Sequence, residues 1–160
     1  MDIAAVVRES IEVIWNRGEL DRLAEFYADD FYWHPAATGR IHAPGSRLFA
    51  PAVAVPWVPG YAGVEQVVRQ MRTIYPDYHE DPQLVIAEGD LVAVRQTVTG
   101  THSGAGPFPA THRSFEVVDM MFCRVRDGKL AEQWGLFDQY SLITQLGLHE
   151  VADARSGTDG

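Results

Sequence analysis

Apolar residues recur at helical spacing in three parts of the chain. In the first of them, Ile3, Val7 and Ile11 share one side of a helical wheel, and the charged residues lie mostly opposite. The last of them ends before Pro76, which cannot continue a helix. We therefore expect three helices, over residues 3–16, 20–27 and 64–75.

Strand-like patterns dominate the rest of the chain, after one short early strand. The Asp127-Gly128 dipeptide joins two long half-apolar segments, and both of its residues tolerate the positive φ of a tight hairpin. Helices that precede an antiparallel meander are typical of an α+β fold. The strands are expected at residues 31–34, 77–87, 91–102 and on both sides of Asp127-Gly128.

Two segments lack a clear period. Residues 36–60 are rich in Pro, Gly and Ala and include the large side chain of Trp57. Such long segments are often lids or binding loops, or else disordered, and we expect Trp57 to contribute to substrate binding. The polar end of the chain is too short to pack, so we expect one domain over 1–149 and a disordered tail over 150–160.

Composition excludes several classes of function. The 160 residues carry a formal net charge of −9, which disfavours binding to nucleic acids or to anionic membranes. Cys123 is the single cysteine, so an internal disulfide is excluded and a reducing compartment is favoured. The first residues have no basic, apolar signal, and no apolar run approaches the length of a membrane span. We expect a cytoplasmic protein.

The hairpin around Asp127-Gly128 carries acidic and aromatic residues where strands more often carry Val or Thr. With a two-residue turn, Asp119 would face Leu136 across the hairpin, and Asp138 would be its diagonal neighbour at about 7–8 Å. Two carboxylates at that distance in an apolar environment resist joint ionisation, so one of them should have a raised pKa. This arrangement suits general acid–base catalysis on a carbonyl compound.

The same pattern permits a second interpretation. This face of the hairpin could point to solvent or to a partner subunit, with the acids serving only to solvate it. A shift of one residue in the pairing would turn each of these side chains over. The pattern alone leaves both interpretations open.

Other side chains are candidates for a pocket. Tyr32 and His34 share one side of the short early strand, while Gln96 and His102 lie on a mostly apolar side of another strand. Met121 and Trp134 would lie opposite each other, on the face that carries Asp119. The six histidines show no metal-ligand spacing, and no phosphate-binding or dinucleotide-binding motif is present. We therefore expect neither a metal nor a cofactor.

Six segments of the chain carry a resemblance to a known family when they are taken in order. They are Trp15-Asn16-Arg17-Gly18-Glu19-Leu20, residues 30–34, Ile86-Ala87-Glu88-Gly89-Asp90, Gly100-Thr101-His102-Ser103-Gly104, residues 127–134 with Asp138, and Gln145-Leu146-Gly147. Together they resemble the SnoaL-like polyketide cyclases of the nuclear-transport-factor-2-like superfamily. The resemblance implies helices packed on a strongly curved antiparallel sheet, which forms a cone with an internal apolar pocket. It also implies cofactor-independent ring closure by intramolecular aldol condensation, of the kind found in antibiotic biosynthesis.

Two positions depart from the family pattern. The family usually carries an Asp directly after the tryptophan of the last strand, where this chain has Gly135. Met121 stands where many members have a polar His or Asp. Asp138 matches a second family Asp, so we expect it to be the leading acid–base group, with Asp119 or His34 as its partner. Tyr32, Gln96, His102, Met121 and Trp134 would then bind the substrate.

We expect an enzyme, a cyclase or isomerase acting on a polyketide-like or polycyclic carbonyl compound. The alternatives are a non-catalytic binder of small molecules, which Gly135 and Met121 favour, and an epoxide-opening enzyme. The latter would need Arg95 in the interior, on the side of its strand opposite to Gln96. The second face of the sheet is also apolar, at Val118, Met120, Phe122 and Phe137, and dimers are common in this family, so we expect a homodimer.

Overall fold

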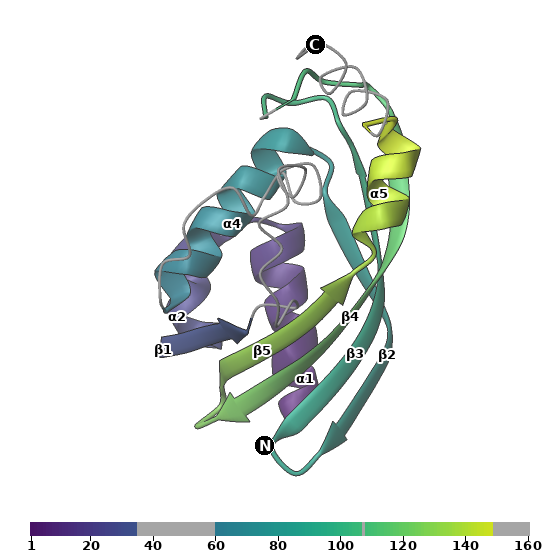
Figure 1. The fold of residues 1–160 in the computed structure, drawn as a ribbon. Coiled ribbons are helices and arrows are strands. Elements are labelled where there is room, and N and C mark those ends of the chain that lie inside the picture. The colour runs from purple at the N-terminus through teal and green to yellow at the C-terminus, as the bar shows by residue number, and fades with distance from the viewer. Residues whose placement is uncertain (35–59, 107, 149–160) are drawn as a thin grey trace, which may run out of the picture.

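A five-stranded mixed sheet organises the molecule (Figure 1). The computed structural model describes residues 1–34, 60–106 and 108–148. The strands are β1 (Tyr27–His34), β2 (His79–Glu88), β3 (Leu91–Thr101), β4 (Ser114–Arg126) and β5 (Lys129–Phe137). Their spatial order is β1-β5-β4-β3-β2. The expected α+β class is confirmed.

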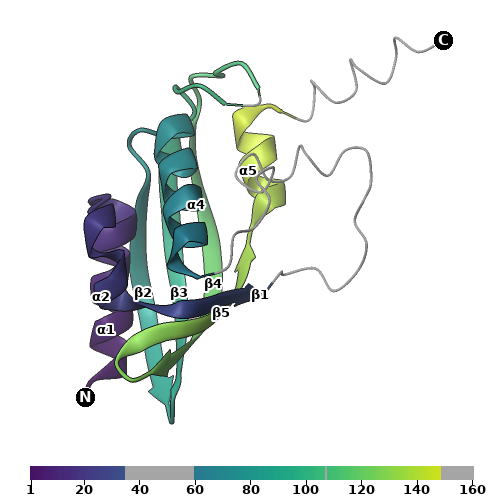
Figure 2. The same ribbon diagram turned by 90° about the vertical axis from the view of Figure 1, so that its left-hand side faces the viewer.

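The sheet differs from the expected one in two respects. The four strands from β2 to β5 pair antiparallel, but β1 pairs parallel with β5. A parallel pair needs a long connection, and most of the chain lies between β1 and β5. The sheet is also twisted and open, with β1 and β5 crossing the direction of the other strands (Figure 2), and it is not strongly curled into a cone.

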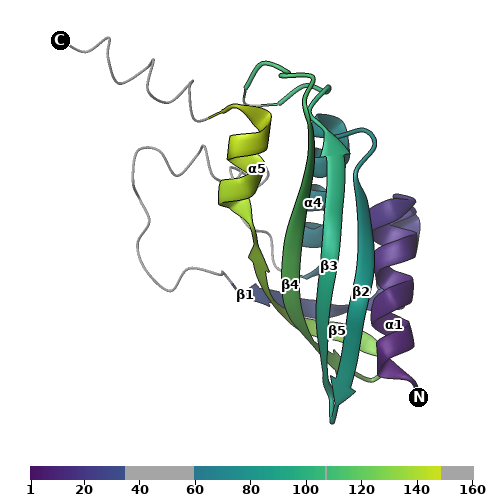
Figure 3. The ribbon, with the colours of Figure 1, turned by 90° about the vertical axis from the view of Figure 1, so that its right-hand side faces the viewer.

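Helices cover one face of the sheet, here called the inner face. Helix α1 (Ile3–Ser10) begins at Asp2, which accepts hydrogen bonds from two backbone N–H groups, and it continues as a π-helical turn over Ile11–Asn16. It runs beside β2, while α4 (Tyr61–Ile74) lies behind β3 and β4 in Figure 3. A short 3-10 turn, Leu20–Arg22, leads into α2 (Leu23–Phe26). The three expected helices are confirmed.

The core lies between these helices and the inner face. Alternation along β3 buries Val92, Val94 and Val98 on this face and leaves the intervening residues partly exposed. On β4 the corresponding buried residues include Val117, Met121 and Cys123. Gln96 and Asp119 occupy the same face, so two polar side chains interrupt an otherwise apolar core.

The β4–β5 hairpin has the expected turn but not the expected register. Asp127 and Gly128 adopt φ values of 52° and 78°, as a tight hairpin turn requires. Beside the turn, Val125 pairs with Leu130, but the next pair is Arg124 with Glu132. Ala131 is therefore the extra residue of a β-bulge, which turns every later side chain of β5 to the face opposite the expected one.

A fourth helix follows β5. Helix α5 (Gln139–Leu146) was not expected, because its eight residues follow directly on a strand with no break other than Asp138. Asp138 is its N-cap and accepts hydrogen bonds from the backbone N–H of Ser141 at 3.0 Å and from the Ser141 hydroxyl at 2.7 Å. The helix covers the end of β4 that extends beyond β5 (Figure 1).

Some expectations concern residues that the structure does not describe. Trp57 and most of the 36–60 segment lie outside the described residues, and so does the tail over 150–160. Among the described helices, none is long and apolar enough to cross a membrane.

Candidate active site

A network of two carboxylates and one amide lies on the inner face of the sheet. The side-chain nitrogen of Gln96 on β3 donates to Glu80 Oε2 at 2.9 Å and to Asp119 Oδ2 at 3.0 Å. Gln96 pairs directly with Asp119 across the β3–β4 ladder, whereas Glu80 pairs with Val98 and is a diagonal neighbour of Gln96. Both N–H groups of one amide therefore join acids from two different strands.

These carboxylates are removed from water to different degrees. Glu80 is only 5% exposed and Gln96 only 1%, while Asp119 is partly buried. Burial, and secondly the charge of Asp119, raise the pKa of Glu80 to about 7. Burial also raises the pKa of Asp119, although hydrogen bonds from Gln96 and from the Met120 backbone oppose the rise. Asp119 is thus the more accessible acid of the pair.

Further hydrogen bonds fix Glu80. The Tyr78 hydroxyl donates to Glu80 Oε1 at 2.6 Å. The Asn16 side chain accepts from the Glu80 backbone N–H at 2.8 Å and donates to its carbonyl at 2.9 Å, which ties the end of the first helix to the start of β2. Among the described residues, neither Glu80 nor Asp119 forms an ion pair, so no basic side chain offsets their charges.

Met121 and Gly135 lie one row further along the inner face, next to Asp119. They pair directly across the β4–β5 ladder. A Cβ atom built on Gly135 would have no neighbour nearer than 4.0 Å, so there is room for a side chain at this position. The two departures from the family pattern therefore adjoin each other, and both adjoin Asp119.

Three expected pocket residues lie instead on the outer face, which is the face of the sheet opposite the inner face. His34 stacks on Trp134 with ring centroids 4.3 Å apart, and the Tyr32 ring meets His34 edge-on at 4.7 Å. His34 Nε2 also lies 2.8 Å from Glu132, which accepts from Arg124 at 3.0 Å. The bulge at Ala131 explains the placement of Trp134, because it turns Glu132 and Trp134 away from the core. Tyr32 and His34 lie on the side of β1 opposite the buried Phe31.

Asp138 lies outside the interior as well. Its side chain is exposed, and hydrogen bonds from the Ser141 backbone and hydroxyl lower its pKa. The expected pairing with Asp119 on one apolar face is therefore wrong, because the bulge shifts the register and the chain leaves β5 for α5 directly after Phe137. Phe137, and not Leu136, is the residue opposite Asp119.

His102 and Arg95 lie apart from the network. His102 follows β3 at its far end, is only 2% exposed, and has its Nδ1 atom 3.2 Å from the Thr111 hydroxyl. Burial lowers its pKa, as does the neighbouring His112. Arg95 lies on the outer face, where it donates to Gln83 at 2.9 Å, so it is not available for an epoxide-opening site in the interior. Of the expected site residues, the structure brings Asp119, Gln96 and Met121 together.

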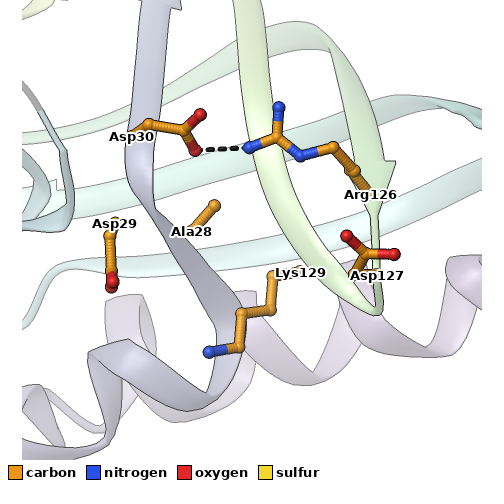
Figure 4. Close-up of a pocket in the computed structure, with 6 residues that line it drawn as sticks. All are labelled: Ala28, Asp29, Asp30, Arg126, Asp127 and Lys129. Atoms are coloured by element: carbon orange, nitrogen blue, oxygen red, sulfur yellow. Dashed lines mark hydrogen bonds and ion pairs between the residues drawn. The ribbon is translucent and has the colours of Figure 1, made fainter.

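Two open hollows flank the sheet. One, of about 280 Å³, adjoins Asn16, His79 and Glu80 beside the first helix. The other, of about 330 Å³, lies between β1 and the tip of the β4–β5 hairpin (Figure 4). Asp30 and Arg126 form an ion pair across it, and Lys129, the single lysine of the chain, lines it. Neither hollow is the deep internal pocket that the resemblance implies.

Glu80 and Tyr78 are the site residues that sequence reasoning missed. The sequence contained a partial signal for Glu80, because residues 77–87 were expected to form a strand. The side chain of Glu80 must then point to one of the two faces of the sheet. The pairing of β2 with β3, which brings Glu80 beside Gln96, contains an irregularity between Pro82 and Leu84 that spacing does not reveal. Within the described residues, no group of three potential His, Cys, Asp or Glu ligands could hold a metal ion.

Comparisons with known proteins agree with this architecture. The family model of SnoaL-like polyketide cyclases matches residues 5–146. IdmH from Streptomyces antibioticus, a provisionally assigned polyketide cyclase, is 30% identical over 92% of this chain and 99% of its own, with a TM-score of 0.72. A comparison with curated sequences finds no match.

More distant structures share the fold. A provisionally assigned polyketide cyclase from Acidithiobacillus ferrooxidans is 21% identical, with 92% of this chain and 96% of its own covered and a TM-score of 0.71. AclR from Streptomyces galilaeus, a provisionally assigned hydroxylase, is 22% identical with the same coverage and a TM-score of 0.69. With a family model that spans almost the whole described chain, this protein belongs to the SnoaL-like polyketide cyclase family and has the nuclear-transport-factor-2-like fold.

Proposed function

We propose that this protein is a cofactor-independent cyclase or isomerase that acts on a polyketide-like or polycyclic carbonyl compound. The observation that carries the proposal is Asp119, a partly buried carboxylate on the inner face with a raised pKa. A carboxylate with a raised pKa is a stronger base than a solvated one, and it can remove a weakly acidic proton at neutral pH. Membership of the polyketide cyclase family supports the substrate class.

The proposed reaction forms one carbon–carbon bond, and the proton that Asp119 takes from the substrate is returned to the product. Asp119 takes a proton from the carbon next to a substrate carbonyl, which leaves an enolate. The enolate carbon attacks a second carbonyl of the same molecule, closing the ring and producing an alkoxide. The proton held by Asp119 then passes to the alkoxide, so that the carboxylate is restored and the product is an isomer of the substrate.

The arrangement around Asp119 supports this role. Gln96, which is almost completely buried, fixes one carboxylate oxygen at 3.0 Å, and the aliphatic side chains of Met121 and Val117 provide an apolar surround. An apolar surround strengthens a base by disfavouring its charged form. In this proposal Asp119 replaces the family Asp whose position Gly135 occupies.

A second candidate is a small-molecule binder without catalytic activity. Met121 and Gly135 pair with each other, so the two positions at which relatives carry polar groups are both apolar here, on one patch of the inner face. A protein of this kind would use the fold to hold an apolar compound, and Asp119 would only accept a hydrogen bond from it.

Turnover of an anthracycline-type polyketide ester by purified variants tests the proposal. Asp119→Asn should lower turnover by at least about 10²-fold, the usual contribution of a general base, while the compound still binds. Asp138→Asn keeps a good N-cap residue and should leave turnover close to wild type. Asp81→Asn, an exposed acid on β2, is the matched control.

Each outcome selects a different conclusion. Loss of turnover in Asp138→Asn but not in Asp119→Asn would return the acid–base role to Asp138 and refute the proposal. Binding of the compound without turnover by the wild type would favour the binder. Incorporation of solvent oxygen into the product would identify a hydrating reaction instead of an isomerisation.

A further inference from the structure

We propose that Glu80 is a positioning residue that holds the Gln96 amide against Asp119, and that the two carboxylates share charge as a coupled pair. The inference rests on the proposed function of Asp119 for its catalytic meaning. It assigns a role to Glu80, a residue on a different strand that is too deeply buried to meet a substrate directly.

The hydrogen bonds of Gln96 give the amide a single favourable orientation. Its nitrogen donates to Glu80 at 2.9 Å and to Asp119 at 3.0 Å, which uses both N–H groups on carboxylate oxygens. A flipped amide would point its oxygen at two carboxylates, which is repulsive while they are ionised. The Gln96 oxygen is buried and has no hydrogen-bond partner among the described residues. Within this part of the chain, the two carboxyl groups are therefore what orients the amide.

Glu80 is itself held rigidly enough to act as the anchor. The Tyr78 hydroxyl donates to its other oxygen at 2.6 Å, and Asn16 holds its backbone on both the N–H and the carbonyl side. Glu80 thus transmits a fixed geometry from the first helix and β2, through Gln96, to Asp119. Loss of the Glu80 carboxylate would release the amide from one of its two acceptors.

The groups that face the pair are acidic or weakly acidic. Tyr78 precedes β2, Tyr27 comes from β1, and Cys123 comes from β4, and the pKa of each is raised by burial and by the charge of Glu80. Among the described residues, no basic group compensates either carboxylate. The pair therefore carries one negative charge more readily than two.

This coupling gives the site two ionisation steps. Asp119, the more exposed acid, ionises first, and Glu80 follows at a pKa of about 7. When Glu80 becomes charged, repulsion raises the proton affinity of Asp119 and makes it a stronger base. Removal of the Asp119 charge must in turn lower the pKa of Glu80, because the coupling is reciprocal.

Carboxyl-carbon NMR titration of the folded protein tests the pair without any substrate. In the wild type, both Glu80 and Asp119 should show an inflection near pH 7. Asp119→Asn should lower the midpoint of Glu80 by about one pH unit. Glu80→Gln should remove the near-neutral inflection from the Asp119 signal. Asp81→Asn should leave both titrations as in the wild type.

The test separates this inference from the proposed function. An unchanged Glu80 midpoint in Asp119→Asn would overturn the coupled pair, whether or not the protein turns over any compound. If turnover is found, the rate of the wild type should rise a second time near pH 7, where Glu80 ionises and Asp119 becomes a stronger base. Glu80→Gln should abolish this second rise and should lower kcat with little change in KM. A uniform loss at all pH values, with the NMR coupling absent, would mean that Glu80 only supports the fold.

Discussion

At the scale of single residues, the burial of Glu80 links the stability of the fold to pH. The pKa of Glu80 is raised from 4.5 in an unfolded chain to about 7 in the folded protein, chiefly by burial. The folded state therefore holds a proton that the unfolded state releases between these two values. The contribution of this group to stability is complete below pH 4.5 and is lost as the pH rises through about 7.

Glu80→Gln should remove this dependence. Relative to the wild type, the free energy of unfolding of the variant should rise by about 3 kcal/mol between about pH 4.5 and about pH 8. Urea unfolding of both proteins across this range measures the difference. His102 contributes equally in all three proteins, and Asp81→Asn removes one acidic residue just as Glu80→Gln does, so the comparison between the two variants isolates the effect of burying Glu80. Parallel stability curves for the wild type and Glu80→Gln would show that Glu80 ionises normally in the folded state.

Gly135 is a second residue with a specific consequence. A Cβ at this position has no neighbour nearer than 4.0 Å, whereas a Cβ on Gly104 would lie 1.7 Å from the Thr73 carbonyl oxygen. Gly135→Asp should therefore fold, and it would place a carboxylate opposite Met121, where the family usually carries its acid. If the site is catalytic, we expect turnover to rise by about 10²-fold.

The contrast between the two glycines provides the control. Gly135→Ala should raise the free energy of unfolding by up to about 1 kcal/mol, because it restricts the unfolded chain without a clash. Gly104→Ala should destabilise the protein by more than that gain, because the added methyl group overlaps the α4 backbone. Thermal unfolding distinguishes the two variants. A folded Gly135→Asp protein with no gain in turnover would count against a catalytic site at this position.

At the scale of elements, the sequence predicted the positions of the helices and strands better than it predicted which side chains of a strand point into the core. The helical spacing of Val7 and Ile11 and the Asp127-Gly128 turn correctly indicated their elements, because both signals are local. The bulge at Ala131 has no comparable signal, because Ala fits either side of a strand. That single residue places Trp134 on the outer face, and with it the expected geometry of the site fails.

Helix α5 illustrates how one element protects another. Its Gln145 side chain accepts from the Glu116 backbone N–H and donates to the Glu116 carbonyl, each at 2.9 Å. Glu116 lies on the part of β4 beyond the end of β5, where the strand edge would otherwise present unpaired backbone groups. The glutamine thus takes the place of a strand neighbour.

Gln145→Ala should therefore expose this edge. We expect the Glu116 amide to exchange with solvent about fivefold faster, since a lost hydrogen bond of about 1 kcal/mol corresponds to that factor. Hydrogen exchange followed by NMR measures the rate. Thr144→Ala, at an exposed neighbouring position on the same helix, is the matched control. Equal exchange rates in the two variants would show that α5 protects β4 by packing alone.

At the scale of the whole molecule, the outer face of the sheet is unusually apolar for a surface. One row across the sheet contains Leu84, Met120 and Leu136, with Arg95 between the first two, and the next contains Ile86 and Phe122, with Ala93 between them. The five large apolar side chains Leu84, Ile86, Met120, Phe122 and Leu136 are between 49% and 64% exposed. Phe137 was also expected on this face, but the bulge in β5 turns it inward and brings Leu136 out. An apolar patch of this kind, with a single arginine in one of its rows, is typical of an interface between proteins.

We propose that a second copy of the chain covers this face, because two identical registered rows can pack against each other about a twofold axis. Phe122→Glu would place a charge at the middle of the patch and should convert a dimer into a monomer. Light scattering coupled to size-exclusion chromatography measures the mass. Tyr140→Glu changes an exposed aromatic residue on α5, 75% exposed, and should leave the dimer intact. A wild-type protein that is monomeric at high concentration would contradict the proposal, and the apolar rows would then need a different partner.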